Sequence, residues 1–112
     1  MPHLIIEHSA DAAPNAALLD AVFQALAAHP AIPKPETLKL RCTPCGLHML
    51  GTKGQSFAHA TLLLLPGRDG ATKSDLAQVI LAEMEKALPG DTSLSVNLAD
   101  LDPAYAKRVP PQ

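Results

Sequence analysis

The chain has 112 residues, of which 47% are hydrophobic and 18% are charged. This length fits one domain over residues 1–112, and the apolar content is enough for a packed core, which excludes a disordered chain. Nine lysines and arginines stand against eleven aspartates and glutamates, with one tyrosine and no tryptophan. A nucleic-acid-binding face needs excess positive charge and stacking aromatics, so we expect no nucleic-acid partner.

Export and membrane insertion are also not expected. No apolar run approaches the roughly 18 residues that a membrane span needs, and the apolar segment Leu4–Ile6 is too short for a signal peptide. Two cysteines, Cys42 and Cys45, do not make the disulfide framework of a small exported protein. We therefore expect a cytoplasmic protein without a membrane partner.

The first half of the chain predicts a strand, a helix and a second strand. His3–His8 is a short apolar run with polar margins, typical of a buried strand. Over Pro14–Ala28 the apolar residues follow the spacing of one helix face, with a proline in the first turn. Prolines then interrupt residues 29–36, and Thr37–Cys42 alternates between apolar and basic side chains. This alternation predicts a strand with a basic face.

The second half predicts the same three elements after a glycine-rich connection. Phe57–Leu65 is a nearly continuous apolar run, typical of a central strand. Thr72–Asp75 has the spacing of a capping box, and the apolar stripe over Leu76–Leu88 predicts a helix behind it. Ser93–Leu98 alternates as a last strand, and a polar tail over residues 99–112 follows.

The resulting order, β-α-β-β-α-β, predicts an α+β fold in which two helices cover one face of a four-stranded sheet. The other face then lacks a cover. We expect it to present a large apolar patch carrying Ala58, Ala60, Leu62 and Leu64 or their neighbours, and we expect self-association to bury that patch.

Two motifs resemble known sites only in part. Cys42-Thr43-Pro44-Cys45 has redox spacing, but no helix pattern follows to lower a thiol pKa, and with His48 it offers three of the four ligands of a closed zinc site. We interpret the cysteines as incidental, with redox exchange and metal binding as the alternatives. Residues 67–74 nearly spell a phosphate-binding loop, but Thr72 replaces the glycine before the lysine. Arg68 precedes a predicted helix N-terminus, a position that suits an anionic group.

Pro2 is the most informative candidate for chemistry. It follows Met1 and directly precedes a predicted buried strand. Removal of Met1 would leave a secondary amine anchored to the sheet. An α-amino group has an unperturbed pKa of about 7.7 to 8.0, and burial beside cationic side chains lowers it. Such an amine is largely a free base near neutral pH and can take a proton from carbon.

Three segments together resemble 5-carboxymethyl-2-hydroxymuconate isomerases of the tautomerase superfamily: Met1–Ser9 (MPHLIIEHS), Phe57–Leu62 (FAHATL) and Gly67-Arg68. The resemblance covers the chain to about Arg108. It implies the β-α-β-β-α-β tautomerase fold, a homotrimer, and proton transfer by the amino-terminal proline without a metal or an organic cofactor.

The resemblance also implies roles for four residues. Pro2 would be the catalytic base, and Arg41 and Arg68 would bind carboxylate or enolate oxygen of a small keto or hydroxy acid. Lys39 occupies the first position of the family's Arg-x-Arg motif, where it offers a point charge instead of a planar fork. The family's longer tail, rich in Asn and His, is replaced by Val109–Gln112.

The expected function is therefore an isomerase that moves a proton within an unsaturated keto or hydroxy (di)carboxylic acid, as in aromatic-compound degradation. One alternative is another reaction at the same proline, such as decarboxylation, hydration or dehalogenation. A second alternative is a non-catalytic trimer that binds a small carboxylate or a partner protein.

Overall fold

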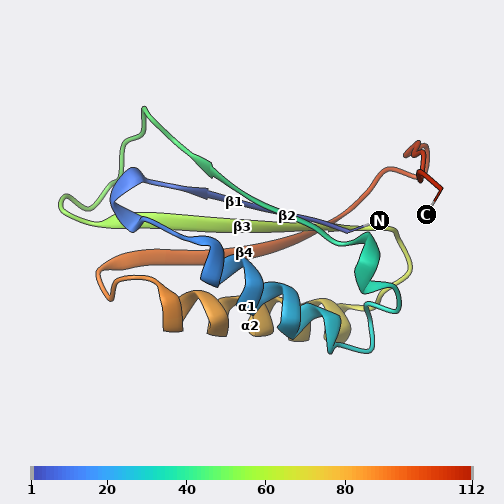
Figure 1. The fold of residues 1–112 in the computed structure, drawn as a ribbon. Coiled ribbons are helices and arrows are strands. Elements are labelled where there is room, and N and C mark those ends of the chain that lie inside the picture. The colour runs from blue at the N-terminus through green and yellow to red at the C-terminus, as the bar shows by residue number, and fades with distance from the viewer. Residues whose placement is uncertain (1, 112) are drawn as a thin grey trace.

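The computed structural model describes residues 2–111, which form a four-stranded sheet with two helices packed on one face (Figure 1). The strands and helices follow in the order β1 (His3–His8), α1 (Ala16–Ala27), β2 (Lys39–Pro44), β3 (Ser56–Leu64), α2 (Gly70–Ala87) and β4 (Thr92–Asp100). Two short 3₁₀ turns lie at Ala10–Ala12 and Pro35–Thr37. The predicted α+β class and element order are confirmed.

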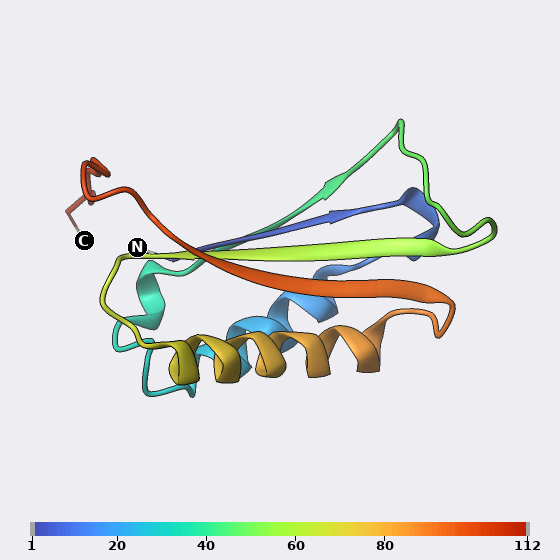
Figure 2. The same ribbon diagram turned by 180° about the vertical axis from the view of Figure 1, so that it is seen from behind.

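The sheet has the strand order β2-β1-β3-β4. Each helix connects two parallel strands, because β1 pairs in parallel with β2 and β3 with β4, while β1 and β3 pair antiparallel at the centre. The two β-α-β halves thus lie side by side, and α1 and α2 run beneath the same face, as the reverse view shows (Figure 2).

The core lies between the sheet and the helices. Every second residue of β1 and β3 is buried there, including Leu4, Ile6 and Leu62 with no exposed surface. The helices contribute residues at one-face spacing, namely Leu18, Val22 and Leu26 from α1 and Leu76, Ile80 and Met84 from α2. Residues that are far apart in the sequence therefore share one apolar layer.

Two predicted boundaries in the first half shift by two residues each. The helix begins at Ala16 and not at Pro14, because the side chain of Asn15 accepts a hydrogen bond from the backbone N–H of Leu18 and so caps the helix. The second strand begins at Lys39 and not at Thr37, because residues 35–37 first form a 3₁₀ turn.

The predicted capping box before Leu76 is wrong. Helix α2 already begins at Gly70, and Asp69 caps it: a carboxylate oxygen of Asp69 accepts from the N–H of Thr72 at 2.8 Å. Hydrogen bonds from the side chain and the backbone of Thr72 hold the pKa of Asp69 below its usual value. Thr72 therefore lies in the first turn of α2 and donates its N–H to the cap, whereas the sequence pattern predicted that Thr72 is itself the cap.

The predicted apolar patch on the open sheet face is also corrected. Ala58, Ala60, Leu62 and Leu64 all point to the helices and are at most 1% exposed. The open face carries their neighbours and a mixture of charged, hydroxyl and apolar groups. Its side chains are His3, Ile5 and Glu7 of β1, Lys39, Arg41 and Thr43 of β2, Phe57, His59, Thr61 and Leu63 of β3, and Ser93, Ser95, Asn97 and Ala99 of β4.

Beyond β4 the chain returns toward the beginning of β1, and both ends of the described chain lie near one another (Figures 1 and 2). The N–H of Leu101 donates to the carbonyl oxygen of Leu64, which holds the start of the tail against β3. In the part of the chain that the structure describes, no helix is both long enough and apolar enough to cross a membrane.

Candidate active site

A cavity of about 380 Å³ lies at the end of the sheet where β1 begins. Four separate parts of the chain enclose it: the start of β1, the connection between α1 and β2, the β3–α2 loop and the C-terminal tail. The lining residues are Pro2, Ile32, Pro33, Lys34, Glu36, Thr37, Leu65, Arg68, Lys107 and Val109. This size and its mainly apolar wall suit a small organic molecule.

Pro2 is a buried residue of this wall. Its carbonyl oxygen accepts a hydrogen bond from the N–H of Lys39 at 3.1 Å, so the pairing of β1 with β2 already begins at this residue. The sheet thereby fixes the backbone of Pro2 next to the cavity. The structure thus places Pro2 at the start of β1 and in the wall of the cavity.

The charged groups around the cavity are mostly positive. Lys34, Arg68 and Lys107 contribute cations, and Glu36 contributes one carboxylate. Cationic groups at an apolar cavity favour a ligand that carries a carboxylate on a hydrocarbon frame.

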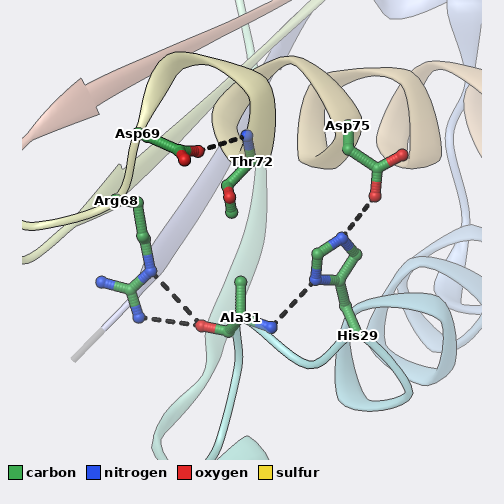
Figure 3. Close-up of polar contacts among 6 residues, drawn as sticks. All are labelled: His29, Ala31, Arg68, Asp69, Thr72 and Asp75. Carbon is green, nitrogen blue, oxygen red and sulfur yellow. Dashed lines mark hydrogen bonds and ion pairs between the residues drawn. The ribbon is translucent and has the colours of Figure 1, made fainter.

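Arg68 reaches the cavity with part of its guanidinium already bound. Its Nε and one Nη donate to the carbonyl oxygen of Ala31 at 3.3 and 2.9 Å (Figure 3), and the other Nη donates to the carbonyl oxygen of Leu65 at 3.0 Å. Three of the five N–H groups of an arginine are thus used within the protein. The remaining two can donate to a ligand in the cavity.

The N-terminus of α2 is a weaker anion site than the sequence suggested. The carboxylate of Asp69 occupies its first turn through the bond to Thr72 (Figure 3). A second anion there would meet this negative charge. Any anion binding by this segment therefore depends on the side chain of Arg68 and not on the helix end.

Lys39 and Arg41 do not line the cavity. Both are exposed on the open sheet face, where β2 forms an edge. The ammonium of Lys39 donates to the carbonyl oxygen of Thr37, which does line the cavity, so Lys39 lies at its margin. Arg41 lies one pleat further and donates to Nδ1 of His3 at 3.3 Å. The structure thus brings Pro2 and Arg68 together and leaves Arg41 on the neighbouring face.

His3 connects Arg41 to the C-terminal tail. Arginine can only donate, so Nδ1 of His3 carries no proton and Nε2 donates to the hydroxyl of Tyr105 at 2.9 Å. The two rings also meet edge to face. Burial lowers the pKa of His3, and the positive charges of Arg41 and Lys39 lower it further. The neutral ring therefore holds the tail next to the cavity.

Sequence reasoning missed Lys34 and Lys107. No motif marks either residue, because each reaches the cavity only through the path of an irregular segment. The prolines around Lys34 and the single Tyr105 before Lys107 were the available sequence features, and neither specifies a place in the cavity wall.

The cysteines lie away from this cavity. Cys42 is on β2 and Cys45 follows it, and both are free thiols. Burial raises the pKa of the Cys42 thiol, which disfavours the reactive thiolate. Among residues 2–111, no group of three or more His, Cys, Asp or Glu side chains is arranged to hold a metal ion.

Comparison with solved structures identifies the fold. A 5-carboxymethyl-2-hydroxymuconate isomerase from Deinococcus radiodurans R1 is 20% identical, with a TM-score of 0.79 over 96% of this chain and 88% of that one. A 5-carboxymethyl-2-hydroxymuconate delta-isomerase is 16% identical, with a TM-score of 0.83 over 98% and 89%. A fused 4-OT wild-type symmetric trimer is 16% identical, with a TM-score of 0.68 over 93% and 91%.

Related folds carry other activities. A member of the cis-3-chloroacrylic acid dehalogenase family and a malonate semialdehyde decarboxylase also match in structure. The sequence matches no protein-family model and no curated protein. On the structural evidence, this chain has the tautomerase fold that 5-carboxymethyl-2-hydroxymuconate isomerases share.

Proposed function

We propose that this protein is an isomerase that moves a proton within an unsaturated keto or hydroxy acid, with Pro2 as the base. The observation that carries the proposal is the burial of Pro2 in the wall of an apolar cavity that also contains Arg68, Lys34 and Lys107. A base, an apolar frame and cations for a carboxylate are the groups that this reaction needs.

The proposed reaction requires removal of Met1, since the nitrogen of an internal proline is an amide without basicity. The free Pro2 nitrogen takes a proton from a carbon next to the substrate carbonyl, and the electron pair of that C–H bond moves into an enolate. Arg68 or a lysine stabilises the developing negative charge on oxygen. The proton then returns to another carbon, which regenerates the free amine.

The test combines the N-terminal mass of the untagged protein with deuterium exchange into a 2-oxo acid followed by NMR. We expect a mass without Met1 and accelerated exchange, and a matched protein with a blocked N-terminus should show none. Replacing Pro2 by alanine keeps an amine and should lose activity in part. Retention of Met1 in the active protein would contradict a role for this amine.

Lys107 gives a cleaner test of substrate binding than Arg68, because Arg68 also supports the fold. Lys107→Ala should raise KM about tenfold or more by removing a charge-assisted hydrogen bond. Lys53→Ala, in the exposed connection between β2 and β3, is the matched control and should leave KM unchanged. Equal kinetics for both variants would remove Lys107 from the site.

A second candidate is a different reaction at the same proline. The decarboxylase and the dehalogenase-family member with the same fold favour it. Release of carbon dioxide or halide from a matching 3-carbon acid, without isomerase activity, would identify this alternative. Binding of the acid without any turnover would instead indicate a non-catalytic carboxylate-binding protein.

A further inference from the structure

A chain of hydrogen bonds runs from the surface of α2 to the cavity through residues that the proposed reaction does not use. Asp75 contacts Nε2 of His29 at 2.6 Å, and Nδ1 of His29 contacts the backbone N–H of Ala31 at 3.0 Å (Figure 3). The carbonyl oxygen of Ala31 accepts the two bonds from Arg68. His29 lies just after α1, so the chain joins both helices to the β3–α2 loop.

The donors in this chain can be assigned from its geometry. A backbone N–H only donates, so Nδ1 of His29 is the unprotonated acceptor and the proton is on Nε2. That proton points to the carboxylate of Asp75, which selects this form of the ring and fixes its orientation. The side chain of His29 is only 10% exposed, whereas that of Asp75 is 65% exposed. The ring is therefore held from both sides.

Ala31 transmits this orientation because both of its backbone polar groups are bound. The N–H of Ala31 donates to the ring of His29, and its carbonyl oxygen accepts two hydrogen bonds from Arg68. The next residues along the chain, Ile32 to Lys34, form part of the cavity wall. A displacement of the Ala31 backbone would therefore move both the acceptor of Arg68 and this wall.

We propose that His29 and Asp75 are positioning residues that hold the backbone of Ala31 and, through it, orient the guanidinium of Arg68 in the cavity. This inference rests on the proposed function only in assigning Arg68 a carboxylate to bind. The orientation itself exists without substrate and can be measured without turnover.

Two substitutions separate the halves of the chain. His29→Asn places an amide oxygen near the position of Nδ1, so it keeps an acceptor for Ala31 but does not reach Asp75. His29→Gln keeps a polar group near Nε2 but leaves the N–H of Ala31 without an acceptor. His48→Gln, in the exposed connection after β2, is the control for loss of a histidine.

The first readout is the Nε–H resonance of Arg68 in ¹⁵N-labelled protein. The chain has three arginines, and loss of one signal in Arg68→Lys assigns it. We expect slow exchange of this proton with water in the wild type and in His48→Gln, and fast exchange in His29→Gln. We expect an intermediate rate in His29→Asn, because it keeps the acceptor for Ala31 but loses the contact with Asp75. Unchanged exchange in a folded His29→Gln protein overturns the proposal, whether or not the protein is an enzyme.

Asp75→Ala provides the same test if His29→Gln does not fold. It removes only an exposed carboxylate and frees the ring of His29. We expect faster exchange of the Arg68 Nε–H here too. Exchange at the wild-type rate would show that Asp75 does not orient the chain and would overturn the proposal.

The second readout is kinetic. In an active protein, misplacement of Arg68 in His29→Gln should raise KM by about tenfold or more and leave kcat within about twofold, because binding geometry changes and Pro2 does not. His29→Asn should restore most of the affinity. Equal KM values for the two variants would contradict positioning. If wild-type protein shows no turnover, the proposed function fails while the exchange measurement still decides the role of His29.

Discussion

Two adjacent residues at the start of β1 have different environments and different chemistry. Pro2 is buried in the cavity wall, whereas His3 lies on the open sheet face between Arg41 and Tyr105. The alternation of a strand places neighbouring side chains on opposite faces. The proposed base and the residue that holds the tail beside it are thus consecutive in the sequence.

The neutral state of His3 gives a pH-dependent stability. Its pKa in the folded chain is below the usual 6.5, so the unfolded chain takes up the proton first as the pH falls. The contribution of His3 is therefore complete above pH 6.5 and decreases as the pH falls through 6.5 toward the lower folded-state pKa.

Urea unfolding at about pH 7.5 and about pH 5.5 measures this effect. His3→Asn cannot titrate and should lose less free energy of unfolding between these two conditions than the wild type. Tyr105→Phe keeps the ring and removes only the hydroxyl that accepts from His3. A pH dependence identical in wild type and His3→Asn would show that His3 does not titrate in this way.

The helices show how capping side chains set the ends of elements. Asn15 caps α1 and Asp69 caps α2, each by accepting an N–H from the residue three positions later. Helix α1 carries no acidic residue in its first turn, so the side-chain amide of Asn15 is the main local group that stabilises the N-terminus of this helix. Of these two caps, only Asp69 lies in a connection that reaches the cavity, namely the β3–α2 loop.

Removal of the Asn15 cap should lower the free energy of unfolding by about 1 kcal/mol. Asn15→Ala tests this by chemical denaturation, and Asn15→Ser, which keeps a capping oxygen, should be close to the wild type. For Asp69, the asparagine variant should retain the cap without the charge and the alanine variant should lose both. An unchanged midpoint in Asn15→Ala would contradict the capping role.

Local patterns predicted the elements better than their faces or their contacts. The alternation of β1 and the apolar spacing of both helices were sufficient to predict them. The apolar run Phe57–Leu65 has leucine at positions 62 to 65, so it could not show which leucines face the helices, because both faces of the strand are apolar there. Asp69 and Thr72 both suit a cap, and only the backbone path of the loop selects Asp69.

The candidate site was predictable only where neighbours along the chain or the family resemblance supplied it. Pro2 and Arg68 were named in advance, and both line the cavity. Lys107 is more than one hundred residues from Pro2 in the sequence, and its approach depends on the return of the tail and on the contact of Tyr105 with His3. Such long-range placement has no local pattern.

At the scale of the whole molecule, the open sheet face decides how copies can associate. It is amphipathic, with basic groups on β2, hydroxyl and amide groups on β4 and a few apolar side chains between them. A partner must therefore satisfy polar groups as well as bury apolar ones. The fused 4-OT structure with this fold is a symmetric trimer, and we propose the same count for this chain.

Light scattering should give a mass of three times 11.8 kDa. Thr61 lies at the centre of the open face, opposite Ile5 on one side and Asn97 on the other. Thr61→Glu should reduce the mass toward that of a monomer without disturbing the helix-covered core. Gln24→Glu, on the exposed side of α1, adds the same charge and should leave the mass unchanged. A wild-type monomer would contradict the proposed trimer.

The contact between Tyr105 and His3 also places an intrinsic fluorescent group close to the cavity. Tyr105 is the only tyrosine, and the chain has no tryptophan, so the near-ultraviolet emission of the whole molecule comes chiefly from a ring two residues before Lys107. A carboxylate that binds Lys107 in the cavity would shift this segment and change the surroundings of the Tyr105 ring. Unlabelled protein can therefore be screened against panels of acids by intrinsic fluorescence alone.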